Sequence, residues 1–283
     1  MSFVDHIRRC NSYDPARILP FFAAGERIGL IRRDNAEALR RFPDVFRVAD
    51  DRVELIAPGD TAAKSRAVDA VVDALIGEKA IPKARNETFA VAPRWGAPAV
   101  FDLDRGAVPF FGTRAYGVHL NGYRRERDEV LLWIGRRAPN KRVSPDKLDN
   151  VVAGGIGNGH GVWETLLKEA DEEAAIPPGL IARAVPAGAV SYRMETPLGI
   201  CDDVLFVYDL DIPAAFAPEN RDGEFVGFSL MPAAQVLDRI RGTDDFKFNV
   251  NLVILDFAVR HGLLHPDDPE YLEVATGLHR PLD

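Results

Sequence analysis

The stretch from Val151 to Ile176 constrains this chain more than any other, because a glycine-rich segment leads directly into an acidic helix-forming segment. Within eight residues the chain has Gly154, Gly155, Gly157, Gly159 and Gly161. Glycine is costly in backbone entropy, so this density predicts a loop in which the chain turns or lets another group come close. The loop does not match a nucleotide fingerprint, since no frame gives G-x-G-x-x-G and no glycine precedes Lys-Ser or Lys-Thr.

The segment after the loop, residues 162–175, is predicted to be a helix because it is rich in helix formers and ends before two prolines. Glu169, Glu172 and Glu173 have i, i+3 and i+4 spacing, so their carboxylates lie close together and repel one another. A hard divalent cation, Mg²⁺ or Mn²⁺, would convert this repulsion into attraction and accept phosphate oxygens as further ligands. The spacing alone also fits a solvated acidic surface.

In register from Gly154 through His160 to Ile176, this stretch resembles the Nudix box. That pattern is Gly, five residues, Glu, seven residues, Arg-Glu, an aliphatic residue, any residue, Glu-Glu, any residue, Gly and an aliphatic residue. The resemblance implies a metal site formed by Glu169, Glu172 and Glu173. The chain departs from the pattern at His160, Lys168 and Ala175. In the family, the first Glu and the Arg form a structural ion pair. We therefore expect His160 to be structural and Lys168 to pair instead with Glu164, four residues earlier.

Three further runs, at residues 113–123, 147–150 and 246–249, together with residues 256–257, resemble one Nudix branch that has a separate N-terminal domain. That branch contains hydrolases of the thiamine diphosphate type. The resemblance implies a small-molecule diphosphate substrate, either thiamine diphosphate or one of its damaged analogues. Three alternatives stay open: hydrolysis of nucleoside diphosphate derivatives, a catalytically silent ligand-binding module, and an interaction protein whose acidic helix is only surface.

Candidate site residues follow from the resemblance and from the positions of charged residues. We expect catalytic roles for Glu172, Glu173 and Glu224, with Glu224 as the candidate base. The candidate substrate contacts are Gly154, Gly155, Lys147, Arg136 and Lys141. The three cations are chosen because they precede the box and suit non-bridging phosphate oxygens. An aromatic slot for a heterocycle is expected from Trp133, Tyr116 or Tyr123.

The predicted fold class is α/β, with two units divided near residue 112. Residues 1–112 are expected to form a smaller N-terminal α+β domain that shapes or covers the substrate pocket. Residues 113–283 are expected to form the Nudix α/β/α sandwich around a mixed sheet. Helices are predicted at residues 35–42, from Thr61 onward as a cap residue, at 233–240 and at 249–261, with a hairpin at 45–56.

Charge and termini limit the partners. Residues 1–112 carry a net charge of +1 and residues 113–283 a net charge of −9, which disfavours nucleic acid as a partner. No run of about 18 apolar residues suggests a membrane span. The acidic residue near the start and the presence of only two cysteines predict a cytoplasmic protein. A homodimer is left open.

Overall fold

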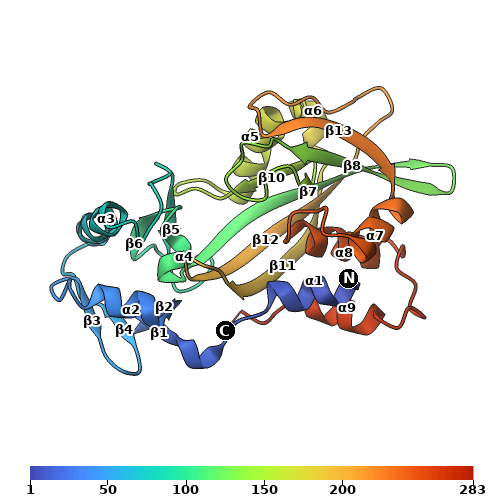
Figure 1. Ribbon diagram of the computed structural model, residues 1–283. Helices are drawn as coiled ribbons and strands as arrows, with labels where there is room; N and C mark the ends of the chain where they lie inside the picture. The colour runs from blue at the N-terminus through green and yellow to red at the C-terminus, as the bar shows by residue number, and fades with distance from the viewer. Residues whose placement is uncertain (283) are drawn as a thin grey trace.

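The computed structural model describes residues 1–282. Within them the N-terminal unit forms a separate group of strands and helices (Figure 1) and has a hydrophobic core of its own. Its main sheet has the strand order β2-β1-β4-β3, and β5 pairs with β6 in a separate ribbon. Its elements are η1 (Pro15–Arg17), β1 (Ile18–Ala23), β2 (Glu26–Arg32), α2 (Arg33–Leu39), β3 (Phe46–Val48), β4 (Val53–Leu55), α3 (Thr61–Gly77), β5 (Thr88–Val91), β6 (Phe101–Asp104) and α4 (Val108–Phe111).

Local sequence explains much of this unit. Helix α3 buries an apolar stripe at helical spacing that includes Val68, Val71 and Leu75, and β3 and β4 form the predicted antiparallel hairpin. The expected cap is one residue off. Asp60, rather than Thr61, accepts the backbone N–H of Ala63 at 2.8 Å, while Thr61 is the first helical residue. A charged carboxylate is a strong acceptor for the free N–H groups of a first turn.

The C-terminal unit is built on a sheet whose main strand order is β11-β12-β7-β8-β13. Strand β12 runs parallel to β7, and the other pairs are antiparallel, so the sheet is mixed. Its elements are β7 (Arg114–Glu126), β8 (Glu129–Arg137), β9 (Leu148–Asp149), β10 (Val152–Gly155), α5 (Val162–Ala174), α6 (Pro178–Ile181), β11 (Val185–Glu195), β12 (Ile200–Asp211), β13 (Phe225–Pro232), α7 (Ala233–Gly242), α8 (Val250–Arg260) and α9 (Tyr271–Gly277).

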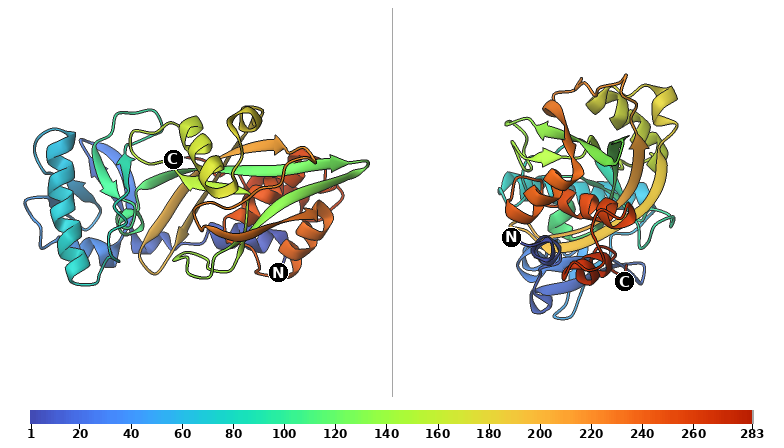
Figure 2. Two further views of the ribbon diagram at one scale, coloured as in Figure 1. Left: turned by 90° about the horizontal axis from the view of Figure 1, so that it is seen from above. Right: turned by 90° about the vertical axis from the view of Figure 1, so that its right-hand side faces the viewer.

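Helices cover this sheet on both faces. Helices α5 and α6 pack on one face, while α7, α8 and α9 pack on the other, and each side has its own buried apolar cluster. The predicted α/β/α sandwich with a mixed sheet is confirmed. In Figure 2 the N-terminal unit lies at one end of the elongated molecule, beyond the ends of β7 and β12.

The first helix, α1 (Phe3–Cys10), lies with the C-terminal unit rather than with the residues that follow it. Phe3, Val4 and Ile7 join the same buried cluster as α8 and α9. The chain therefore starts in one unit, crosses to the other and returns at β7. The division near residue 112 stays a prediction.

The glycine segment differs from the expected loop. Gly154 and Gly155 belong to β10, which pairs antiparallel with β7, and irregular structure begins only after them. Close packing accounts for both glycines. A Cβ atom at Gly154 would lie 2.4 Å from Cγ of Glu169, and one at Gly155 would lie 2.8 Å from Cζ of Phe89. The expected close approach is therefore made by side chains of the protein itself.

Within residues 1–282, no helix has both the length and the apolar composition that a membrane crossing requires.

Candidate functional site

A cavity of about 410 Å³ lies between the two units, a volume suited to a small molecule. The C-terminal sheet contributes its floor, and the N-terminal unit contributes Phe89, Arg105 and the start of α4. Among the described residues that line it, six side chains are cationic: Arg85, Arg105, Arg137, Lys141, Arg142 and Lys247. Such a lining favours an anion with several charged oxygens.

Sheet register determines which residues face the cavity. His119, Gly117 and Ala115 alternate along β7, so they point to one face, and the parallel register aligns Asp203 of β12 with Ala115. Tyr192 of β11 is in turn paired with Asp203. The cavity floor thus combines Ala115 and Gly117 of β7 with polar side chains on β12 and on β11 beyond it.

A cluster of carboxylates lies beside this cavity. One oxygen each from Glu173, Asp222 and Glu224 falls within 4.8 Å of the others. Glu173 is only 4% exposed and accepts the backbone N–H of Ala153 at 2.8 Å. Burial raises the pKa of Glu173 well above its usual range, and nearby acidic groups, including Glu169, raise it further. Grouped hard oxygen ligands of this kind fit Mg²⁺ or Mn²⁺.

Glu224 connects the carboxylate cluster to the cations of the cavity. Its oxygens pair with Arg137 at 2.7 Å and with Lys141 at 2.5 Å. Arg137 also pairs with the fully buried Asp149 at 2.8 Å, and Lys247 approaches the same Asp149 oxygen at 3.2 Å. Burial alone would raise the pKa of Asp149, but Lys247, His119 and Arg137 together hold it below its usual range. These charges are therefore fixed before any ligand arrives.

The other two glutamates predicted to bind metal, Glu169 and Glu172, lie beside the cluster but are not part of it. Lys168 contacts Glu169 at 3.1 Å and Glu172 at 2.9 Å, and Glu172 is about half exposed. The expected pairing of Lys168 with Glu164 is wrong. Glu164 instead caps the helix by accepting the backbone N–H of Gly161 at 3.0 Å, which satisfies a free donor of the first turn. His160 is exposed in the preceding loop.

The candidate substrate contacts divide into two groups. Gly154, Gly155 and Lys141 line the cavity. Lys147 and Arg136 do not: Lys147 pairs with Asp244 at 3.4 Å, and Arg136 pairs with Asp146 at 2.9 Å near the surface. Both side chains have carboxylate partners closer than the cavity, which explains their positions.

Of the three candidate aromatic residues, only Tyr116 lines the cavity. Its ring stacks with Phe206 and contacts Trp95. Tyr123 packs against Phe257 in the core, and Trp133 packs on the opposite buried cluster. The pocket therefore uses one of the three expected rings.

Several cavity residues were not identified from the sequence. Arg85, Phe89 and Arg105 come from the N-terminal unit, where no local pattern grouped them. Asp222 joins the carboxylates from the turn before β13. One signal was available: the run 246–249, which carried part of the family resemblance, places Lys247, Phe248 and Asn249 at the cavity.

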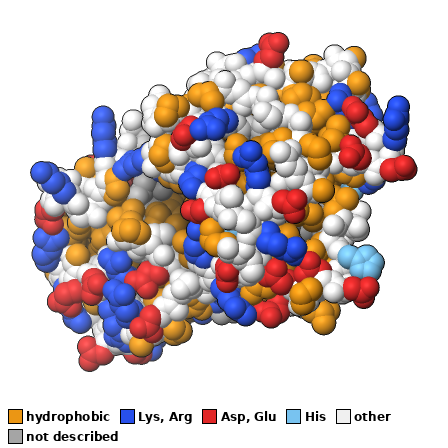
Figure 3. All heavy atoms as spheres, turned by 45° about the vertical axis from the view of Figure 1, so that its right-hand side comes forward, with side chains coloured by type: hydrophobic (Ala, Val, Ile, Leu, Met, Phe, Trp, Pro, Cys, Tyr) orange, Lys and Arg blue, Asp and Glu red, His pale blue; other side chains and the backbone are white. Residues whose placement is uncertain are grey.

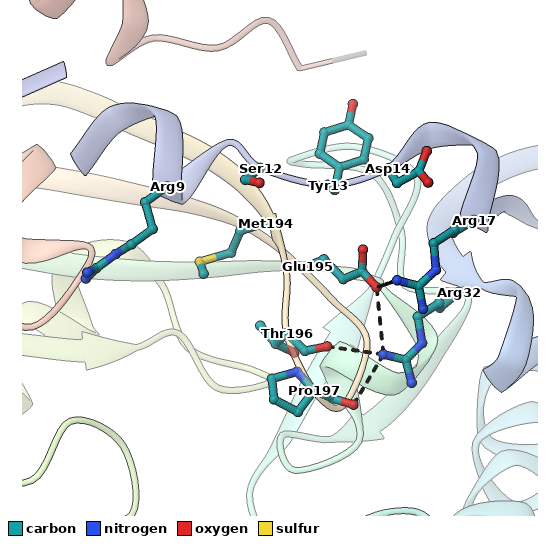
Figure 4. A pocket seen from close by; sticks show the side chains of 10 residues that line it. All are labelled: Arg9, Ser12, Tyr13, Asp14, Arg17, Arg32, Met194, Glu195, Thr196 and Pro197. Carbon is teal, nitrogen blue, oxygen red and sulfur yellow. Dashed lines mark hydrogen bonds and ion pairs between the residues drawn. The ribbon is translucent and has the colours of Figure 1, made fainter. Parts of the chain in front are cut away.

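A second hollow, of about 730 Å³, is open to solvent and lies near the β11–β12 turn (Figure 4). Its arginines are engaged within the protein. Arg17 pairs with Glu195 at 3.1 Å, and Arg32 donates to the carbonyl oxygens of Thr196 and Pro197. Arg9 pairs with Asp244 at 2.8 Å. These contacts leave this hollow less suited to an anion than the cavity between the units.

On the face shown in Figure 3, acidic and basic side chains are interspersed.

Helices on both faces of a mixed sheet, with buried carboxylates beside a cationic cavity, define an enzyme-like site for a small phosphorylated molecule. The family described as "NUDIX domain" matches residues 114–250, and "Domain of unknown function (DUF4743)" matches residues 2–115. Arabidopsis thaliana "Nudix hydrolase 20, chloroplastic" is 40% identical over 287 residues, covering 96% of this chain and 76% of that protein. Arabidopsis thaliana "Nudix hydrolase 24, chloroplastic" is 40% identical over 277 residues, with the same coverage. The chain belongs to the Nudix family and is a hydrolase of pyrophosphate-containing small molecules.

Among solved structures, the chain is similar to the Nudix domain of Shewanella oneidensis NrtR complexed with ADP ribose. The identity is 16%, the alignment covers 57% of this chain and 94% of that one, and the TM-score is 0.42.

The predicted cytoplasmic location is contradicted, because both Arabidopsis relatives are described as chloroplastic. The prediction depended on the first residues of the chain. Those residues form α1 and pack in the core, so their composition reflects packing and gives no guide to location.

Proposed function

We propose that this Nudix hydrolase cleaves the diphosphate linkage of thiamine diphosphate or of a damaged analogue, with Mg²⁺ or Mn²⁺ as its cofactor. The observation that carries the proposal is the cationic cavity of about 410 Å³ that adjoins the carboxylates of Glu173, Asp222 and Glu224. The thiamine part of the substrate is suggested by the runs at 113–123, 147–150 and 246–249, which resemble the Nudix branch that contains hydrolases of the thiamine diphosphate type.

The metal would be held by Glu173 and Asp222, with Glu169 and Glu172, which lie on the same helix as Glu173, supplying further oxygens. A buried Glu173 beside other carboxylates supports this assignment, since a cation relieves the cost of burying like charges. When bound, the divalent ion neutralises phosphoryl oxygens and lowers the pKa of water. In the metal-free protein, the Lys168 ammonium supplies positive charge to Glu169 and Glu172.

The remaining residues bind and orient the substrate. Arg85 and Arg105 approach the cavity from the N-terminal unit, and Lys141 approaches it from the C-terminal unit. The buried Nε of Arg85 has no hydrogen-bond partner among the described residues, so it is available to a phosphate oxygen. Glu224 is the proposed base, and its salt bridges to Arg137 and Lys141 hold its carboxylate in place at the edge of the cavity.

The test is release of phosphate or of a monophosphate from a substrate panel at matched concentration, with Mg²⁺ and with EDTA. The panel contains thiamine diphosphate, its oxidised analogues, nucleotide sugars, ADP-ribose and oxidised nucleoside triphosphates. We expect metal-dependent turnover that is fastest with a thiamine-type compound. Faster turnover of a nucleotide would reject the thiamine assignment. Ligand-induced thermal stabilisation without turnover would instead support a silent binding module.

A further inference from the structure

The part of the cavity formed by β11, β12 and the residue before α8 has polar groups that the phosphate chemistry does not use. Asp203, Tyr192 and Asn249 meet there, and all three line the cavity. Tyr192 is 1% exposed and Asn249 is 6% exposed, so both side chains are almost completely removed from bulk water. Buried polar groups are costly unless they are hydrogen-bonded, which makes this arrangement informative.

The hydrogen bonds among these residues fix their orientation. Tyr192 Oη donates to a carboxylate oxygen of Asp203, and Asn249 Nδ2 donates to Tyr192 Oη at 3.3 Å. Because the amide nitrogen is used in this bond, Asn249 Oδ1 is the atom left over. It is buried and has no hydrogen-bond partner among the described residues. The end of the cavity therefore presents acceptors rather than donors.

This end is separate from the carboxylate cluster. Asp203 lies on β12, whereas Glu224 directly precedes β13, and both β7 and β8 lie between those strands in the sheet. Near the cavity β7 and β8 diverge, because they pair only at residues 123–126 and 129–132, while β10 pairs with β7 and β9 pairs with β8. Asp203 and Glu224 therefore lie on different branches of the sheet. A ligand whose diphosphate lies at Glu224 can therefore extend an organic group toward Asp203. Phe248, which packs edge-on against Tyr192 at 5.8 Å, offers an apolar side to such a group.

We propose that Asp203 and Asn249 are specificity-determining residues that accept hydrogen bonds from the N–H groups of an amino-substituted heterocycle, with Tyr192 as the positioning residue between them. The inference deepens the proposed function, on which it rests for the place of the diphosphate. An unsatisfied buried acceptor rejects a ligand that lacks the matching donor, so this pair selects by hydrogen bonding rather than by size.

The test measures binding rather than turnover, by calorimetric titration in EDTA. The ligands are thiamine diphosphate, which carries an aminopyrimidine, oxythiamine diphosphate, in which an oxo group replaces the amino group, and isopentenyl diphosphate, which has no heterocycle. We expect Asn249→Ala to weaken thiamine diphosphate at least tenfold and isopentenyl diphosphate less than twofold. Asp203→Asn replaces an acceptor with a donor, so it should shift the preference at least tenfold from the amino toward the oxo compound.

Tyr192→Phe is the conservative variant, because it keeps the ring and removes only the hydroxyl that orients both acceptors. We expect an intermediate loss for thiamine diphosphate alone. Equal losses for all three ligands, or no loss for any, would overturn the proposal. If Asp203→Asn does not fold, Asn249→Ala and Tyr192→Phe decide the question. Wild-type protein that binds thiamine diphosphate through these residues but does not hydrolyse it with Mg²⁺ would refute the proposed function and leave this subsite intact.

Discussion

Replacing Glu173 by Gln should stabilise the metal-free protein while removing its response to metal. Glu173 is 4% exposed, and its carboxylate lies within 4.8 Å of carboxylate oxygens of Asp222 and Glu224. At an effective dielectric constant of about 20, two unit charges at that separation repel by about 3 kcal/mol. Arg137 and Lys141 neutralise Glu224, and Asp222 is exposed, so we expect a net gain of only about 1 kcal/mol on substitution. Glutamine can still accept the Ala153 N–H.

The assay is thermal unfolding in EDTA and in 10 mM Mg²⁺. In EDTA, about 1 kcal/mol should raise the Tm of Glu173→Gln by roughly 2–4 °C at neutral pH. In Mg²⁺, a site with a Kd of about 0.1 mM would stabilise the wild type by about 2.7 kcal/mol, and the variant should lack this gain. Hydrolysis should fall by about 100-fold or more, because even the loss of an outer-sphere partner of a metal costs 10–100-fold.

The pH dependence of the stability gives a second test of the same variant. The folded protein raises the pKa of Glu173, so burial of its charge costs stability as pH rises above the unfolded value of about 4.3. The advantage of Glu173→Gln should therefore shrink as pH falls toward that value. Glu172→Gln is the matched control. Glu172 is about half exposed and pairs with Lys168, so this variant should not gain stability in EDTA. An unchanged Tm for Glu173→Gln in EDTA, together with a full response to Mg²⁺, would refute the reasoning.

Three further predictions address the site. Gly154→Ala should reduce kcat about tenfold or more, because the new Cβ would lie 2.4 Å from Cγ of Glu169 and displace that side chain. Gly157→Ala is the control, because its new Cβ would lie 3.6 Å from the nearest atom and should leave kcat unchanged. Equal kcat values for the two variants would contradict the packing argument. Lys141→Ala should raise KM about tenfold, the cost of one charge-assisted hydrogen bond, while Lys147→Ala leaves KM unchanged in the same steady-state assay. Burial raises the pKa of Asp203 to about 6 against the opposing effect of the Tyr192 hydrogen bond, with Asp202, Arg105 and Lys247 as the surrounding charges. Calorimetric affinity for thiamine diphosphate should therefore fall below about pH 6 and level off above it, and Asp203→Asn should show no such change.

Local sequence patterns predicted the elements whose stabilisation is local. The apolar stripe of α3 and the many helix-forming residues of α5 predicted helices whose bounds are close to the observed ones. Strand β10 was not predicted because its sequence is rich in glycine. Gly154 and Gly155 are required there because Glu169 and Phe89, which come from other elements, pack too close to leave room for a Cβ atom. Lys168 was assigned to Glu164 by spacing, yet helix capping at Gly161 is the stronger use of Glu164.

The site followed the same rule. Glu173 and Glu224 were candidates from sequence, and the structure places them together, but their partner Asp222 is exposed and follows no periodic pattern. Asp203 was not among the site residues predicted from the sequence. It faces the cavity only because β11 and β12 align it with Tyr192. Residues 246–249 resembled the family without a mechanical reason, and the reason is long-range: the segment brings Lys247 to Asp149 and Asn249 to Tyr192.

The unequal net charges of the two halves of the chain make sense because both halves line the same cavity. The carboxylates that would hold a cation belong to the acidic C-terminal half, whereas Arg85 and Arg105 come from the N-terminal half. A diphosphate bound to a metal there would still carry negative charge. Arg85 and Arg105, which would face it from the opposite side, belong to the unit that has its own hydrophobic core. Because Phe89 packs over Gly155 and Asn158 donates its backbone N–H to Thr88 at 2.7 Å, the two halves keep a fixed contact beside the helix that carries the glutamates. We therefore expect the N-terminal unit to do more than cover the pocket, since Arg85 and Arg105 would supply part of the positive charge for phosphate binding.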